Sequence, residues 1–259
     1  MSLNIGDALE TAVSRTATRA GLTLVGAFFV LQLLVTLFST NMNAALQSTV
    51  SPAEVAPVVL PVGALASGVL SLVAYVCIAY LGIVAIRSMV SDVTDHIPGE
   101  FFSRRVGPAL VWWFVASIVV GILVTIGFVL LVIPGIYLSL GLAFTLVYVA
   151  VEDETAFTAM QSSWDLAAGH RWRLLATFLV PAVVYLVVVG ILGVVLPSTT
   201  VAGWVVTGLV GAVWGVFVQA LLGACYRQLR DAADDADAGN DAGPADGGDD
   251  APRATVADA

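Results

Sequence analysis

Side chains that could do chemistry are scarce in this chain, and the densest group lies in one short stretch. The segment SSWDLAAGHRWRLL, residues 162–175, places charge, aromatic rings and a helix breaker between two long apolar runs. Histidine could serve as an acid–base group or a metal ligand, and the chain has two of them, His96 and His170. They stand in separate connections, and the segment DVTDH that ends at His96 offers at most an opportunistic cation site. A solvated loop explains that segment better.

Recognisable catalytic spacings are missing from the sequence. It contains no G-x-x-x-x-G-K-[ST] nucleotide loop, no G-x-S-x-G, no H-E-x-x-H and no D-G-x-x-A-R segment of membrane alcohol phosphotransferases. The middle of each long apolar run also lacks Asp, Glu, His and Arg, the groups on which proton relays and ion-coupled transporters usually depend. We therefore predict no catalytic residues, no cofactor and no metal site, and we expect that the protein is not an enzyme.

The composition indicates whether the helices of this chain are surrounded by water or by lipid. Hydrophobic residues make up 59% of the chain and charged residues 11%, about half the charged share of a soluble domain. Apolar runs long enough to cross a bilayer recur along the chain, and a backbone in lipid must satisfy its hydrogen bonds internally. The sequence predicts an all-α, polytopic bundle of six transmembrane helices, with spans near 19–39, 60–86, 107–132, 135–151, 174–196 and 201–225.

Arginine placement orients these spans. All ten basic residues are arginine, and they fall before the first span, between the second and third, between the fourth and fifth, and after the sixth. The positive-inside rule then predicts a multi-pass protein of the cell (plasma) membrane with cytoplasmic N- and C-termini. In this scheme the chain forms three consecutive hairpins and a six-span membrane domain over residues 19–230.

Two amphipathic helices are expected at the membrane surface. Residues 153–169 place Phe157, Met160, Trp164 and Ala168 on one stripe, and Gly169 suits a helix C-terminus that needs positive φ. We expect an interfacial elbow helix there, and a second interfacial helix over residues 1–18. Membrane lipids are the expected partner, and the predicted interfacial anchors are Trp164, Arg171, Trp172 and Arg173. A protein-docking surface is the less favoured alternative.

The sixth span carries a small residue or amide at every fourth position. A groove of this kind lets helix backbones approach closely in lipid, where the hydrophobic effect gives no drive for association. Gly211 and Gly215 form its clearest part, and an amide at Gln219 should face another helix because an unsatisfied amide in hydrocarbon is costly. The predicted helix-packing residues are Gly203, Thr207, Gly211, Gly215, Gln219 and Gly223.

The C-terminal tail differs from the rest of the chain. Nine of the nineteen acidic residues are Asp located after Arg230, where almost no large apolar residue occurs. The segment 231–259 is therefore predicted to be a disordered acidic tail, and its charge argues against a nucleic-acid partner. Absence of lysine together with abundant Asp resembles proteins of extreme halophiles, although GC-rich codon usage would give the same bias.

Residues 130–175 resemble a known family of membrane domains. The I-P-G-I-Y turn at 133–137, the acidic Glu152 and the S-W-x-L-x-x-G-x-x-W pattern from Ser163 to Trp172 are similar to the membrane domain beside some glycerophosphodiester phosphodiesterases and to YciC-like uncharacterised multi-pass proteins. The residue usage described above leads us to expect a member from a halophilic archaeon. The resemblance implies a helical membrane domain of unassigned activity. Glu152 could pair with Arg171 or Arg173, and helix capping explains it equally well.

Two functions remain open at this point. The favoured hypothesis is a non-catalytic membrane-organising or accessory protein, and a membrane-protein partner is compatible with it. The alternative is a transporter or lipid-handling membrane protein. Substrate, partner and oligomeric state are not predicted by the sequence.

Overall fold

All regular structure in the described part of the chain is helical. The structure, a computed structural model, describes residues 4–46, 58, 60–91, 97–196 and 200–241. Six helical segments within these residues are long and apolar enough to cross a membrane, which confirms the all-α class. Most of their ends lie within a few residues of the ends of the predicted spans. Uncharged runs of this length form stable helices where lipid or protein covers them.

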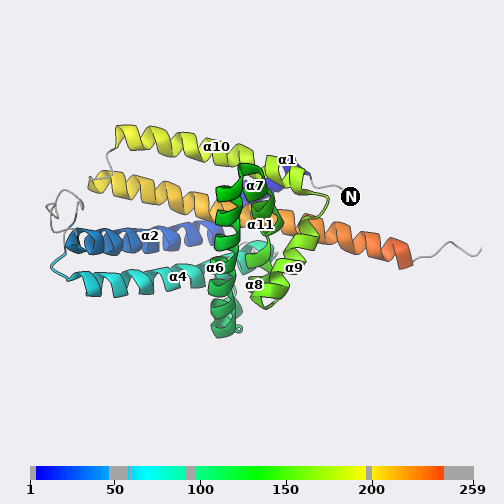
Figure 1. The fold of residues 1–259 in the computed structure, drawn as a ribbon, viewed down its shortest axis with the longest axis horizontal. Helices are drawn as coiled ribbons and strands as arrows, with labels where there is room; N and C mark the ends of the chain where they lie inside the picture. The colour runs from blue at the N-terminus through cyan, green and yellow to red at the C-terminus, as the bar shows by residue number, and fades with distance from the viewer. Residues whose placement is uncertain (1–3, 47–57, 59, 92–96, 197–199, 242–259) are drawn as a thin grey trace, which may run out of the picture.

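The long helices α2 (Arg19–Leu46), α4 (Ala64–Val90), α10 (Arg171–Val195) and α11 (Val201–Asp241) lie side by side (Figure 1). Helix α11 packs against the other three, and α2 pairs closely with α4. We call the end of this bundle where Arg19, Arg87, Arg171 and Arg230 lie the arginine-bearing end. The ends of the helices at Leu46, Ala64, Val195 and Val201 lie at the opposite end.

The middle pair of predicted spans has a different direction. Helix α6 (Val106–Leu130) and helix α7 (Val132–Gly141) form a hairpin that runs across the long helices instead of beside them (Figure 1). The consecutive hairpins expected from the sequence are α2–α4, α6–α7 and α10–α11, and the second of them differs from the other two in direction. A Cβ on Gly127 would lie 2.9 Å from the Cα of Gly135, so the absence of side chains lets α6 and α7 meet.

The fourth predicted span is broken. Helix α7 ends at Gly141, and helix α8 (Thr145–Val151) begins after a short irregular link. The elbow helix α9 (Ala156–Ala167) follows α8 and packs against it, and a single turn of helix, α5 (Glu100–Ser103), precedes α6. The hydrophobic core is concentrated where α4, α8, α9 and α11 meet, at the arginine-bearing end.

The N-terminal helix α1 (Ile5–Thr16) is shorter than the 1–18 segment predicted. Its buried residues are Ala8 and Ala12, and it packs on α11 as well as on α10 and α2. The side chain of Asn4 caps it by accepting from the backbone N–H groups of Gly6 and Asp7. Leu9 and Val13, from its predicted apolar face, line a groove between α2 and α10.

The prediction of disorder from residue 231 is wrong for the first part of the tail. Helix α11 continues to Asp241 and extends beyond the bundle (Figure 1). Elongating a helix that the membrane span has already nucleated costs little, and Ala232 and Ala233 favour it. Nε of Arg230 lies 4.0 Å from Oδ1 of Asp234, which is one helical turn further along α11. The predicted disorder of residues 242–259 lies outside the described residues.

Candidate functional site

The charged side chains of the described residues gather at the arginine-bearing end, and several of them meet around the turn between α8 and α9. This turn holds Glu152, Asp153 and Glu154, each with a different set of partners. Asp153 has a positive φ of 56°, an uncommon conformation for a residue other than glycine. The turn therefore aims three consecutive carboxylates in three directions.

Arg87, in the last turn of α4, joins four parts of the chain. Its Nε donates to the carbonyl of Ala150 at 2.6 Å, and its Nη1 donates to the carbonyls of Arg104 at 2.8 Å and Phe101 at 3.3 Å. Its Nη2 forms an ion pair with Asp153 at 3.1 Å, and the side chain of Arg87 is 5% exposed. A buried arginine with its donors paired in this way fixes where α6 begins relative to α4 and α8.

The Asp153 carboxylate also forms an ion pair with a second arginine. Arg104 lies 3.2 Å from Asp153, but its side chain is 60% exposed. Sequence analysis did not single out Arg87 or Asp153. An arginine in the last turn of a long apolar run was the available signal, because it must find carbonyl or carboxylate partners to remain there.

Glu152 pairs with α11. It accepts from the hydroxyl of Tyr226 at 2.5 Å and from Nη1 of Arg230 at 2.7 Å. The suggested pairing of Glu152 with Arg171 or Arg173 stays a prediction. Helix capping does not explain Glu152, since the N-cap of α9 is Thr155, whose hydroxyl accepts from the N–H of Thr158.

The elbow helix is anchored to the α7–α8 break by one buried hydroxyl. Ser163 donates to the carbonyl of Gly141 at 2.9 Å and accepts from the N–H of Phe144 at 3.1 Å, so it satisfies backbone groups that the break leaves unpaired. The predicted turn at Gly169 is confirmed, with φ at 79°. The predicted elbow range 153–169 shortens to Ala156–Ala167, and its small residues are buried. Of the predicted stripe, Phe157 is exposed, whereas Trp164 contacts α7.

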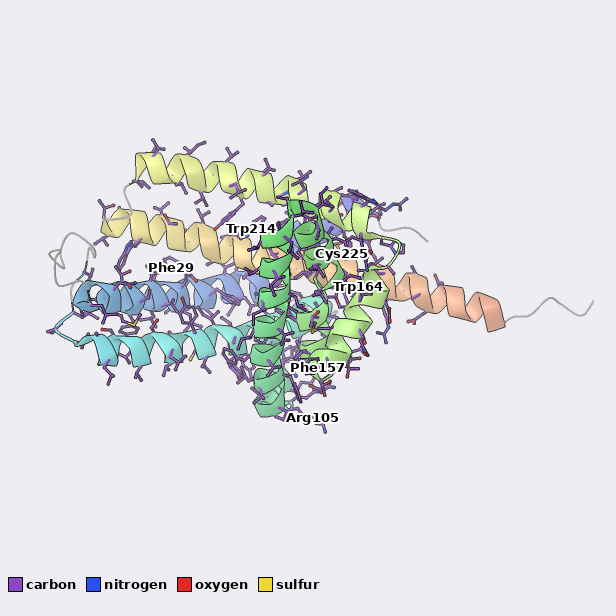
Figure 2. All side chains as sticks on the ribbon, viewed as in Figure 1. Phe29, Arg105, Phe157, Trp164, Trp214 and Cys225 are labelled. Atoms are coloured by element: carbon purple, nitrogen blue, oxygen red, sulfur yellow. The ribbon has the colours of Figure 1, made fainter. Side chains whose placement is uncertain are left out.

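Arg171, Trp164 and Tyr137 form an aromatic cluster, which we call the Arg171 cluster. The guanidinium carbon of Arg171 lies 4.0 Å from the ring centre of Tyr137 and 4.0 Å from that of Trp164. The two rings meet edge to face, with centres 5.5 Å apart. A Cβ on Gly141 would lie 2.6 Å from the Trp164 ring, so the ring needs a glycine there. Figure 2 labels Trp164 on α9, near the junction of the hairpin with the long helices.

The four predicted interfacial anchors thus occupy different environments. Trp164 and Arg171 contact each other inside the cluster, whereas Trp172 is 82% exposed and Arg173 is exposed. The I-P-G-I-Y segment, predicted as a turn, lies within α7, because the chain reverses at Leu131 instead. It meets the S-W pattern here through Tyr137 and Trp164. Anchoring of these residues in a lipid headgroup layer stays a prediction.

The predicted groove on α11 makes close contact at one end only. Gly223 faces Met89 of α4, whose backbone would lie 3.4 Å from a Cβ at Gly223, and Gly203 is buried. In the described part of the chain nothing lies within 4 Å of a Cβ placed on Gly211 or Gly215, so no described helix reaches the predicted centre of the groove. Thr207 is exposed, and the amide oxygen of Gln219 is buried without a hydrogen-bond partner among the described residues.

The fold and this site define a class, a polytopic helical membrane protein whose polar groups are concentrated at one end of the bundle. The chain belongs to the family described as a domain of unknown function, DUF7847, which its residues 3–229 match. Comparisons with curated proteins and with solved structures found no match. Within the described residues no group of three or more His, Cys, Asp or Glu side chains could hold a metal ion.

Proposed function

We propose that this is a non-catalytic membrane-organising protein of the cell membrane, with both termini in the cytosol. In this proposal α2, α4, α10 and α11 cross the bilayer, and the α6–α7 hairpin lies within the cytosolic leaflet. The single observation that carries the proposal is the crosswise course of this hairpin at the arginine-bearing end (Figure 1). A hairpin in one leaflet makes the protein wider on that side of the membrane.

The tip of the hairpin has the composition of a turn buried in lipid. Residues 129–133, Val-Leu-Leu-Val-Ile, are between 62% and 81% exposed, and none is polar. Two other connections between predicted spans also lack arginine, residues 41–57 and 197–200. Both contain polar residues such as Ser, Thr, Asn or Glu. Five exposed branched apolar residues in water would be costly, whereas lipid is a suitable surrounding for them.

The backbone at the tip also tolerates lipid. Only Leu131 interrupts the helices, and its N–H donates to the carbonyl of Gly127 at 3.0 Å. The N–H of Gly135 donates to the carbonyl of Leu131 at 3.3 Å. Few backbone groups are therefore left unpaired, as the hydrocarbon requires.

Arginine placement agrees with this topology as well as with six crossings. Residues 104, 105, 171 and 173 flank the α6–α7 segment and lie on one side whether the hairpin crosses or stays in one leaflet. The buried polar groups of the site join helices, as Arg87 and Asp153 do, which supports a structural role for them.

We further propose that the acidic tail faces the cytosol of a halophilic cell, where high salt screens its charge. Kinship with the glycerophosphodiester phosphodiesterase membrane domain stays a prediction.

Cysteine labelling tests the placement. In a background with Cys77 and Cys225 replaced by alanine, Leu131→Cys should resist a membrane-impermeant maleimide from either side of sealed vesicles. Gly63→Cys, exposed at the opposite end of the bundle, is the matched control and should react from outside. Equal outside labelling of the two variants would show that the hairpin crosses the membrane and would overturn the proposal.

Lipid handling is the second candidate, and one groove favours it. A groove of about 710 Å³ lies between α2 and α10 on the surface of α11, with Pro181, Trp214 and Leu9 among its lining residues. Its lining is almost wholly apolar and it opens laterally, so a lipid chain could enter it. Lipid-scrambling assays in liposomes test this candidate, and activity no higher than that of empty vesicles would exclude it.

A further inference from the structure

The Arg171 cluster holds a cation without a protein counter-charge. Among the described residues Arg87 and Arg230 each pair with a carboxylate, whereas no carboxylate oxygen lies within 4.0 Å of the Arg171 guanidinium. Its Nε is buried and has no hydrogen-bond partner in the part of the chain that the structure describes. Arg171 is partly exposed, so an anion from outside the chain can reach this guanidinium, which no carboxylate of the described residues neutralises.

The two rings determine how such an anion can approach. The centres of the Tyr137 and Trp164 rings are each 4.0 Å from the guanidinium carbon and only 5.5 Å from each other, so both rings lie on one side of the guanidinium and the other side is left for a ligand. Contact with aromatic rings stabilises the cation but does not neutralise it. A planar guanidinium presents paired N–H donors that match the oxygens of a phosphate.

A cleft beside the guanidinium is apolar. It has a volume of about 190 Å³ and lies between α7 and α10, with Arg171 at its margin and Ile136, Trp172 and Leu175 among its lining residues. A cation at the margin of an apolar cleft matches an amphiphile, with a phosphate at one end and a hydrocarbon chain at the other. A free phosphate ion would use only the first of these features.

We infer that the Arg171 cluster binds a phospholipid of the cytosolic leaflet, with its phosphate on Arg171 and part of an acyl or isoprenoid chain in the α7–α10 cleft. Basic sites between transmembrane helices on the cytosolic side are suited to anionic headgroups, so a lipid with net negative charge should be preferred. The leaflet assignment rests on the proposed placement of the hairpin, whereas the binding site itself rests only on the contacts above.

Native mass spectrometry of the full chain in detergent, mixed with phosphatidylglycerol, tests the site without any assumption about topology. Arg171→Met keeps the length of the side chain and its contact with the rings but removes the charge. It should lower the retained phosphatidylglycerol at least about tenfold, the equivalent of one charge-assisted hydrogen-bonded contact. Arg19→Gln, an exposed arginine at the same end of the bundle and outside the cluster, is the matched control and should retain the lipid as the unaltered chain does.

Two further arms separate the parts of the inference. Ile136→Trp should fill the cleft and reduce retention, whereas Val187→Trp on an exposed part of α10 should not. Inorganic phosphate at millimolar concentration should fail to displace the lipid. Equal retention by the unaltered chain and Arg171→Met, with Arg171→Met folded by its melting curve, would overturn the inference, and displacement by inorganic phosphate would assign the site to a free anion.

The outcome is distinguishable from failure of the proposed function. Labelling of Leu131→Cys from outside, together with Arg171-dependent retention, would reject the leaflet placement and leave the lipid site standing. Loss of the retention effect with an unlabelled tip would reject the lipid site alone.

Discussion

At the scale of single residues, buried charges in this protein are distinguished by the partners they find. Arg87 and Asp153 are nearly buried and pair with each other, Glu152 pairs at the protein surface with Arg230, and Arg171 is held by aromatic rings. The free energy of each arrangement differs, because removing water strengthens an ion pair and also raises the cost of breaking it. Burial therefore determines which of these residues stability should depend on.

Arg87→Met should be strongly destabilising. It leaves three carbonyls and the Asp153 carboxylate short of a donor in a buried place, and breaking one partner of a buried pair typically costs about 3–5 kcal/mol. We expect a clear fall in the melting temperature of the detergent-solubilised protein.

Arg104→Met provides the control, since Arg104 pairs with the same carboxylate from a side chain that is 60% exposed. Its loss should cost less than about 1 kcal/mol. Similar melting temperatures for the two variants would contradict the role given to Arg87.

At the scale of helices, small residues allow close packing only where another helix is present. Gly223 meets the backbone of Met89 on α4, whereas Gly215 has open space at its Cβ position. Sequence spacing places both on one face of α11 but does not say what lies opposite each. The structure therefore separates two residues that the pattern treats alike.

Gly223→Leu should lower the melting temperature, because a branched side chain would push α11 from α4, at a typical cost of about 1–3 kcal/mol. Gly215→Leu should leave it unchanged or raise it slightly, since leucine is the better helix former. A fall caused by Gly215→Leu alone would instead indicate that a neighbour outside this chain covers that position.

Much of the helical layout could be predicted from the sequence. Long uncharged runs gave the positions of α2, α4, α6, α10 and α11 to within a few residues at most ends, and Gly169 marked the turn after α9. The hydropathy of a segment does not say how its helix is oriented, however. It therefore could not distinguish a helix that crosses the membrane from one that lies across the bundle. The pairing of Glu152 with Arg230, 78 residues away, depended on how the helices pack and could not be read from local spacing.

At the scale of the whole molecule, the crosswise hairpin makes one end of the protein wider than the other (Figure 1). If α2, α4, α10 and α11 cross the bilayer, α6 and α7 add apolar volume to the leaflet at the arginine-bearing end and little to the opposite leaflet. An excess of volume in one leaflet favours bending of the membrane toward that side. Membrane organisation is then a consequence of shape and needs no catalytic group.

Reconstitution with rising protein-to-lipid ratio should therefore yield smaller or tubular vesicles, measured by electron microscopy. Leu131→Arg should weaken this effect, because burying an arginine in the bilayer costs roughly 2.5–3.5 kcal/mol and would draw the exposed tip toward water. Leu46→Arg is the matched control, as Leu46 is equally exposed but stands at the opposite end of the bundle, near the membrane surface. Vesicles of unchanged size with the unaltered protein, or equal remodelling by Leu131→Arg, would show that the hairpin does not act as a wedge.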